Sequence, residues 1–135
     1  MVLPARYRAR LSEICGNQVV ITIDTDQPCL LMYPLNEWEL VEAQVDALPS
    51  FHEATKRIKR LLLGHATDVE VDANGRFLLS NSLREHANLS KKVVLIGQGK
   101  KFEIWDEEIW HQSKQVWLTD KLTGDLPQSL AELSL

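Results

Sequence analysis

The sequence consists of two similar halves, and this internal repeat is the feature that most limits how the chain can fold. Three pairs of segments align: 2–8 with 78–84, 19–23 with 93–97, and 30–38 with 102–110. Their offsets are 76, 74 and 72 residues, so the spacing changes by two at each of two loops, where a change of length costs little. A chain of 135 residues with such a repeat is expected to form two related units in one compact or intertwined protein.

Each half is predicted to contain a short helix, a strand, a turn, a strand and a helix. The short helices are expected at 4–11, where Pro4 suits a first helical position, and at 82–88, where Ser82 and Glu85 form a capping box. Strands rich in valine, isoleucine and aromatic residues are expected at 18–24, 29–33, 92–97 and 101–105. The polar sequences DTDQP and GQGKK connect them as turns.

Two further helices are expected between the halves. The first begins at Asn36 with Glu39, and the second begins at Ser50 with Glu53 and ends at Gly64. The apolar face of the second is expected to contain Phe51, Ala54, Ile58, Leu61 and Leu62. Its basic residues, Lys56, Arg57, Lys59 and Arg60, then form the solvated side of a packed helix.

These elements divide the chain into four parts. They are a first module at 1–37, connecting helices at 38–65, a second module at 66–110 and a C-terminal polar tail at 111–135. The final segment, LPQSLAELSL, is expected either to form a helical turn or two or to fray.

The sequence VDANGRFLL at 71–79 predicts a hairpin turn between two apolar strands. Asn74-Gly75 is typical of tight turns that need positive φ angles, and Asp72 and Arg76 bracket it. One interpretation is an exposed Asp72–Arg76 pair that closes the hairpin and contributes about 0–1 kcal/mol. The other is that the hairpin presents Arg76 to a guanine edge or a phosphate in a DNA major groove. The residues alone leave both open.

Only the second half contains this turn. The offset of 76 places the counterparts of Asp72 and Arg76 at positions −4 and 0, immediately before Met1. We therefore expect in-frame codons upstream to encode about 12–15 further residues, a strand and a loop that end in a sequence like Gly-Arg. A stop codon or an unrelated sequence there would contradict this expectation.

The distribution of charge permits a local basic face although the net charge is −4. Residues 1–101 contain 13 Lys/Arg against 12 Asp/Glu, whereas residues 102–135 contain 2 against 7. Arg6 and Arg8 follow the position of the absent loop, and Arg84 matches Arg8 in the repeat. These three arginines either form solvated surface or contact phosphates and position the protein without reading sequence.

The motifs of catalysis and membrane insertion are missing from the sequence. The four histidines make no metal-binding spacing, and no glycine-rich phosphate loop or nucleophile elbow occurs. We therefore expect no enzyme, no cofactor and no metal. The apolar runs are too short to span a bilayer, and Cys15 and Cys29 are expected to be small core residues in a reducing cytoplasm.

Taken together, these features resemble the MraZ family of bacterial transcriptional regulators, which contain two AbrB-like (SpoVT-AbrB) swapped-hairpin modules. The resemblance covers essentially all of the chain. Its motifs are DANGR with the following FLL, RIKRLLLGHA at 57–66, PCLLMYPLNEWE at 28–39, VVLIGQGKKFEIWDEEIWH at 93–111 and the final LAELSL. It implies an α+β fold in which duplicated swapped-hairpin half-barrels form a pseudo-two-fold β-barrel flanked by helices.

The resemblance also implies a function. A family member would be a sequence-specific, DNA-binding repressor of its own promoter and of the adjacent division and cell-wall gene cluster. It would bind short direct repeats of double-stranded DNA as a homo-oligomeric ring, in the cytoplasm at the nucleoid and without a membrane. The expected DNA-binding residues are Arg76, Asp72, Asn74, Gly75, Arg6, Arg8 and Arg84.

Two alternatives from other classes stay open. One is a structural oligomer or protein-interaction module that has no specific DNA binding and joins its acidic tail to basic patches. The other is binding of single-stranded RNA or DNA through aromatic side chains. Trp38 and Trp110 occupy equivalent repeat positions, however, so packing in a core or a subunit interface is the favoured interpretation for them.

Overall fold

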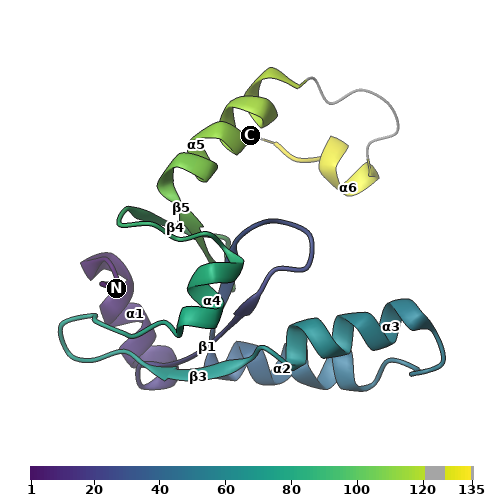
Figure 1. The fold of residues 1–135 in the computed structure, drawn as a ribbon, viewed down its shortest axis with the longest axis horizontal. Coiled ribbons are helices and arrows are strands. Elements are labelled where there is room, and N and C mark those ends of the chain that lie inside the picture. The colour runs from purple at the N-terminus through teal and green to yellow at the C-terminus, as the bar shows by residue number, and fades with distance from the viewer. Residues whose placement is uncertain (121–126, 135) are drawn as a thin grey trace.

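The computed structural model describes residues 1–120 and 127–134, which build a five-stranded antiparallel sheet with helices on both faces (Figure 1). The strands lie in the order β3-β1-β2-β5-β4. Their bounds are β1 Gln18–Ile23, β2 Leu30–Pro34, β3 Thr67–Glu70, β4 Val93–Gly97 and β5 Phe102–Asp106. The four strands expected in the two repeats are thus confirmed to within one residue at each end.

Helices fill most of the remaining described chain. Their bounds are α1 Ala5–Cys15, α2 Leu35–Asp46, α3 Glu53–Ile58, the π-helical turn η1 Lys59–Leu63, α4 Asn81–His86, α5 Glu107–Thr119 and α6 Gln128–Ala131. In Figure 1, α2 and α3 extend side by side to the right of the sheet, and α5 rises from the opposite end of the strands. None of the described helices combines the length and apolar content needed to span a bilayer.

The two hairpins of the sheet repeat one another in detail. Val20 lies opposite Tyr33 in β1–β2, and the equivalent Val94 lies opposite Trp105 in β4–β5. Between the hairpins, Leu31 of β2 lies opposite Glu103 of β5, and these two positions are themselves equivalent in the repeat. The pairing of the four strands is therefore symmetric about the Leu31–Glu103 pair.

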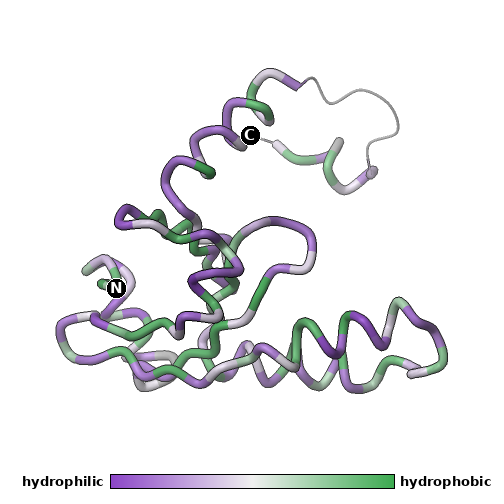
Figure 2. The backbone as a smooth tube through the Cα atoms, viewed as in Figure 1, coloured by the Kyte–Doolittle hydropathy of each residue, from purple (hydrophilic) through white to green (hydrophobic). Residues whose placement is uncertain are grey.

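Alternating side chains of the strands enter two separate clusters, as expected for a period of two. One face of the sheet contributes to a core with α1 and α4, whose members include Leu11, Val19, Ile21, Met32, Phe77, Leu83 and Ile104. The other face contributes Val20, Leu31 and Tyr33, which pack with Trp38 of α2. In Figure 2 hydrophobic and hydrophilic colours alternate along α2 and α3, as expected of helices with one packed face.

An aromatic pair lies at the C-terminal end of β2, and an equivalent pair lies at the C-terminal end of β5. The rings of Tyr33 and Trp38 are 5.5 Å apart, and those of Trp105 and Trp110 are 5.6 Å apart. Trp117 of α5 joins the second pair at 5.8 Å from Trp105. The expected packing role of Trp38 is confirmed because its side chain is buried, and Trp105 is fully buried.

The π-helical turn before β3 has a specific partner in the sheet. The fully buried Thr22 of β1 donates its hydroxyl to the carbonyl oxygen of Leu62 at 2.6 Å. Lys59 on the same turn donates from Nζ to the carbonyl oxygens of Asp46 and Leu48 and to Ser50 Oγ. Lys59 thereby binds the last carbonyl of α2 and one in the segment that follows it, so its side chain joins η1 to the end of α2 and is not only a solvated surface group.

Several expected helix boundaries are wrong. Ser80, and not Ser82, caps α4, because Ser80 has extended backbone angles and its Oγ accepts the Leu83 N–H. Helix α2 begins at Leu35 after Pro34, one residue before the expected Asn36. Helix α3 begins at Glu53 and not at the expected Ser50, whose hydroxyl oxygen accepts a hydrogen bond from Lys59 Nζ.

The ends of the predicted helices differ further. Phe51 is 89 % exposed because it precedes α3 and does not lie on its packed face. The first helix continues to Cys15, and the helix after Asp106 continues to Thr119. In the final segment, α6 forms the expected helical turn, while Leu126 and Leu135 lie outside the described residues. The side chain of Cys15 also lies outside that part of the structure.

The expected β-barrel is not closed. The strands β3 and β4 form the two edges of an open sheet. The segment after the DANGR turn leaves β3 and forms a bridge between Arg76 and Val2, instead of the second strand of a hairpin. The reason is that Met1 and Phe77 exchange backbone hydrogen bonds, which hold this segment against the N-terminus.

Candidate nucleic-acid interface

The loop 72–76 is organised by the carboxylate of Asp72. Asp72 Oδ1 accepts hydrogen bonds from the backbone nitrogens of Asn74 and Arg76, both at 2.8 Å. The backbone closes the same turn, with Asp72 N–H donating to the Arg76 carbonyl and Gly75 N–H donating to the Asp72 carbonyl, both at 2.9 Å. Asp72 therefore fixes the shape of the loop through its backbone.

Arg76 is exposed at the end of this loop, which follows β3 in the chain. Within 1–120 and 127–134, the ion pair in the structure joins Lys56 and Glu53, and none joins Asp72 to Arg76. The first interpretation, in which an Asp72–Arg76 ion pair closes the hairpin, is therefore not what the structure shows. The guanidinium is left available to a ligand, as the second interpretation requires.

Gly75 is required by both its backbone angle and its neighbours. Its φ is +78°, in the left-handed region that favours glycine. A Cβ at this position would lie 2.3 Å from Arg8 Nε and 2.8 Å from the Leu3 carbonyl oxygen. No residue with a Cβ fits at position 75, because the loop packs directly against the segment that leads into α1 and against Arg8.

The three other predicted arginines occupy different environments. Arg8 is half-buried, and its Nε donates to the Leu3 carbonyl at 2.9 Å, so it supports the loop from beneath. Arg6 is exposed, and its guanidinium carbon lies 4.7 Å from the centre of the Tyr7 ring. Arg84 is half-buried on α4 and lines a surface cavity beside β4. The structure therefore brings Arg8 to the loop and places Arg84 at another edge of the sheet.

The surface beside Arg76 is mixed in character. A groove of about 610 Å³ runs between β3 and residues 76–78, and its walls include Asp68, Glu70 and Leu78. Leu78 is 87 % exposed. One loop thus offers a single cation beside carboxylates and an apolar patch, which predicts weak attraction to a phosphate backbone when it acts alone.

Sequence reasoning missed the contribution of the N-terminal residues to this loop. Leu3 N–H donates to the Gly75 carbonyl, and the Met1 ammonium donates to the Phe77 carbonyl at 3.0 Å. The repeat contained a signal for this contact, because the offset of 76 makes Met1 and Phe77 equivalent positions. Equivalent residues that pair with one another mark a centre of symmetry in an antiparallel arrangement.

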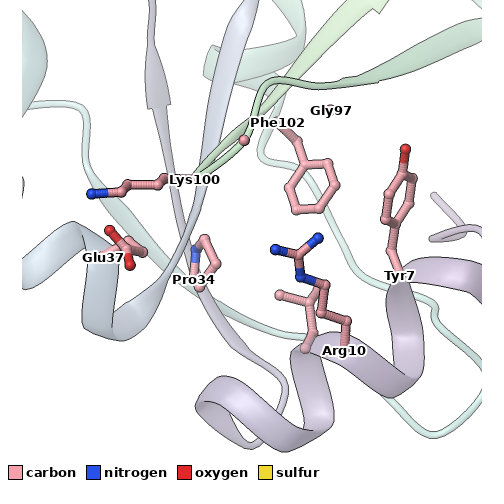
Figure 3. A pocket seen from close by; sticks show the side chains of 9 residues that line it. Tyr7, Arg10, Pro34, Glu37, Gly97, Lys100 and Phe102 are labelled. Carbon is pink, nitrogen blue, oxygen red and sulfur yellow. The ribbon is translucent and has the colours of Figure 1, made fainter.

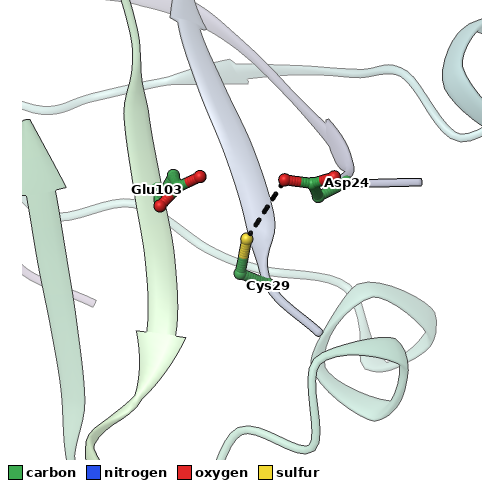
Figure 4. A group of neighbouring side chains, drawn as sticks. All are labelled: Asp24, Cys29 and Glu103. Atoms are coloured by element: carbon green, nitrogen blue, oxygen red, sulfur yellow. Dashed lines mark hydrogen bonds between the residues drawn. The ribbon is translucent and has the colours of Figure 1, made fainter. Parts of the chain in front are cut away.

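A second polar cluster lies within the sheet, away from the loop. The Cys29 sulfur and one carboxylate oxygen from each of Asp24 and Glu103, all atoms of a kind that can bind a metal ion, lie within 4.8 Å of one another (Figure 4). Cys29 Sγ donates to Asp24 Oδ2 at 3.6 Å, and Glu103 Oε1 accepts from the indole nitrogen of Trp105 at 3.0 Å. Burial, with the two carboxylates beside it, raises the pKa of the Cys29 thiol far above its ordinary value. The expected burial of Cys29 is confirmed, and its thiol is protonated at neutral pH.

A separate cavity of about 500 Å³ lies between α1, the start of α2 and the β4–β5 turn (Figure 3). The rings of Tyr7 and Phe102 form a T-shaped pair on one side of it, with ring centres 4.7 Å apart. Arg10, Glu37 and Lys100 line the rest of it, so the cavity has charges of both signs. Its walls contain no residue of the 72–76 loop, so Arg10 belongs to a different surface from Arg76.

Comparison with known proteins gives a consistent result over the whole chain. The family model described as "MraZ protein, putative antitoxin-like" matches twice, at residues 1–61 and 62–121. A protein of Legionella pneumophila (strain Corby) named "Transcriptional regulator MraZ" is 47 % identical over 137 residues, and a protein of the same name from Alkalilimnicola ehrlichii is 46 % identical over 135 residues. A third of that name, from Pseudomonas aeruginosa (strain LESB58), is 47 % identical over 136 residues. Each alignment covers 100 % of this chain and 90 % of the relative.

Proposed function

This chain belongs to the MraZ family, and we propose that it is a DNA-binding transcriptional regulator that acts through the loop 72–76. The names of its relatives, which are transcriptional regulators, and the exposed Arg76 support this proposal. A major groove admits protein elements as wide as a two-stranded β-ribbon, and arginine makes bidentate contacts with guanine there. Regulation of transcription, and not catalysis, is the function that these relatives indicate.

The single observation that carries the proposal is that Asp72 holds the loop backbone while the Arg76 side chain stays exposed. The Asp72 carboxylate binds backbone N–H groups of the loop, and the guanidinium of Arg76, the residue after Gly75, has no ion pair within the described residues. A preorganised loop with a free arginine loses little conformational entropy when it binds. Arg6 and Arg84 would add phosphate contacts, and Arg8 would act by supporting the loop.

We extend the proposal to repression of the chain's own promoter and of the adjacent division and cell-wall genes, through short direct repeats bound by a ring. The resemblance to the family supports these details, and so does the weakness of a single loop. Several loops on one rigid assembly gain affinity through their effective concentration. A cytoplasmic location at the nucleoid follows from that role.

The test is a binding titration with the duplex that precedes the chain's own reading frame, against a scrambled duplex of equal length. The protein is expected to prefer the first duplex, with an affinity that falls steeply with salt. Arg76→Ala is expected to weaken that binding by about tenfold or more, since a bidentate contact contributes about 1–3 kcal/mol. The matched control is Arg57→Ala, which removes an exposed cation from α3.

Oligomer size, measured by light scattering, should be the same for Arg76→Ala and the unmodified chain. Equal binding by the two proteins would show that Arg76 is not the reading residue. Equal binding to both duplexes would favour the second candidate, an assembly module without specific DNA binding. That candidate is supported by the exposed apolar side chains of α5, which are Val116, Trp117 and Leu118.

A further inference from the structure

One cavity of the molecule lies at a place that is filled in the other half of the repeat. It is the cavity of about 500 Å³ between α1, the start of α2 and the β4–β5 turn (Figure 3). Three of its wall residues have core residues as their repeat equivalents, and these pairs are Tyr7–Leu83, Gly97–Ile23 and Phe102–Leu30. Since all three equivalents are buried aliphatic side chains, the same place in the fold is closed in one half and hollow in the other.

Gly97 is the residue that keeps the cavity open. A Cβ at this position would lie 3.2 Å from the hydroxyl oxygen of Tyr7 and 3.8 Å from Cδ1 of Phe102. A side chain as large as that of Ile23 would therefore occupy the space between the turn and α1. Tyr7 in turn brings a hydroxyl group and a ring to a wall where the other half has a leucine. The result is a hollow lined by rings in place of an aliphatic contact.

Three charged side chains from separate segments surround this hollow. Arg10 lies on α1, Glu37 in the first turn of α2 and Lys100 in the β4–β5 turn. Figure 3 shows Lys100 and Glu37 together at one end of the cavity, and Arg10 with the two aromatic rings at the other. Among the described residues, none of these three charged groups takes part in an ion pair. The cavity therefore offers two cations and one carboxylate to a ligand.

These groups match the parts of a nucleotide. A carboxylate only accepts hydrogen bonds, so Glu37 calls for a ligand with N–H donors, and the Lys100 ammonium beside it calls for an acceptor. Guanine presents its O6 acceptor on the same edge as two N–H donor groups, and bases stack on aromatic rings such as Phe102. A guanidinium such as that of Arg10 binds phosphate through paired hydrogen bonds. The cavity also has the size of small-molecule sites, which is about 300–1,000 Å³.

We propose that this cavity is a nucleotide-binding site and that its preferred ligand is a guanine mononucleotide. The base lies against Phe102, with its edge towards Glu37 and Lys100, and the phosphate lies against Arg10. The excess of one positive charge among the wall residues suits an anionic ligand. The proposal concerns a small molecule and is independent of whether Arg76 binds DNA.

The experiment is isothermal titration calorimetry of the full chain with GMP, guanosine, AMP and inorganic phosphate. Saturable binding of one GMP per chain is expected. Guanosine should bind about tenfold more weakly, because it lacks the anionic group that Arg10 binds. AMP should bind about threefold more weakly, because adenine offers Glu37 fewer donor groups. Equal affinities for GMP, AMP and inorganic phosphate would show a cationic surface without a built site and would overturn the proposal.

Two substitutions separate the ends of the ligand. Arg10→Gln changes an exposed side chain and should weaken GMP binding by about tenfold while changing guanosine binding by less than about twofold. Glu37→Gln should remove the preference for GMP over AMP. The matched control is Arg57→Gln, which removes an exposed cation of α3 outside the cavity and should bind GMP as the unmodified chain does. Equal losses with Arg10→Gln and Arg57→Gln would contradict the assigned site.

A double variant tests the cavity itself. Tyr7→Leu combined with Gly97→Ile copies the residues that close the other half, Leu83 and Ile23, so the chain should remain folded by circular dichroism and lose GMP binding. GMP binding that this folded variant retains would place the nucleotide elsewhere, and the proposal would be wrong. No saturable binding of GMP to the unmodified chain would overturn it as well. If the double variant unfolds, the comparison of Arg10→Gln with Arg57→Gln decides.

Discussion

Asp72 Oδ1 lies 2.8 Å from the backbone nitrogen of Arg76, and the Arg76 side chain beyond it is exposed. The two residues therefore cooperate without forming an ion pair, because the carboxylate binds the peptide groups of the loop. This relationship makes the shape of the loop and the availability of its arginine two separate properties. They can be tested by separate substitutions.

Removal of the Asp72 carboxylate should loosen the loop while leaving Arg76 in place. Asp72→Ala loses two hydrogen bonds to backbone N–H groups, and the free energy of unfolding is expected to fall by about 0.5–2 kcal/mol, as for the loss of a helix cap. DNA affinity should fall as well, since a mobile loop must be ordered on binding. Urea unfolding and the binding titration measure the two effects. Asp68→Ala, an exposed carboxylate of β3, is the control and should show neither loss of stability nor loss of affinity.

Two glycines with similar backbone angles should respond differently to alanine. Gly75 and Gly99 have φ angles of +78° and +74°, so both substitutions carry the same left-handed strain of about 1–2 kcal/mol. Only at Gly75 does the new Cβ meet Arg8 Nε and the Leu3 carbonyl, whereas nothing lies within 4 Å at Gly99. Gly75→Ala should therefore lower the thermal midpoint further than Gly99→Ala. Equal midpoints for the two variants would show that the contact between the loop and α1 is not maintained in solution.

The acid stability of the chain should depend on Asp106. Its carboxylate accepts two hydrogen bonds from Ser90 and one from Ile109 N–H, and the side-chain bond from Ser90 is the main cause that lowers its pKa. A carboxyl with a lowered pKa stabilises the fold above its unfolded pKa of about 3.9, and this contribution disappears as the pH falls through the folded value. Asp106→Asn should therefore be less stable than the unmodified chain at pH 7, with the difference shrinking at pH values below about 4.

Urea unfolding at several pH values gives this comparison directly. Ser90→Ala removes the donor that lowers the pKa of Asp106 most and is expected to reduce the same pH-dependent contribution. A difference between Asp106→Asn and the unmodified chain that stays constant from neutral to acidic pH would contradict the assigned role.

The Cys29 thiol should be inert in the native protein. It is fully buried, it donates to Asp24, and its pKa is raised by burial, so almost none of it is thiolate at pH 8. Iodoacetamide at pH 8 is expected to leave Cys29 unmodified in buffer and to alkylate it fully in urea, as read by peptide mass spectrometry. Alkylation of Cys29 at comparable rates in both conditions would show that the β2 region opens readily.

The repeat and the alternation of apolar residues were enough to predict four strands and the equivalence of Trp38 and Trp110. The strand predictions succeed because each depends on neighbours within a few residues, and the equivalence of the two tryptophans follows from the alignment of the two halves. The cap of α4 was misplaced because Ser80 and Ser82 both suit a capping position, and only the backbone angles distinguish them. Phe51 was placed on a packed face because its spacing fits, although the helix begins two residues later.

In the candidate site, too, some features could be predicted from the sequence and others could not. From sequence alone, Asp72, Gly75 and Arg76 could be placed on a turn, because the composition of a short loop determines its backbone conformation. The sequence also determined that the two hairpins have equivalent residues. It could not determine that Arg8 supports the loop or that β3 pairs with β1. Those features depend on hydrogen bonds between segments more than forty residues apart, such as Val19 with Val69 and Met1 with Phe77, and only the packed chain brings these segments together.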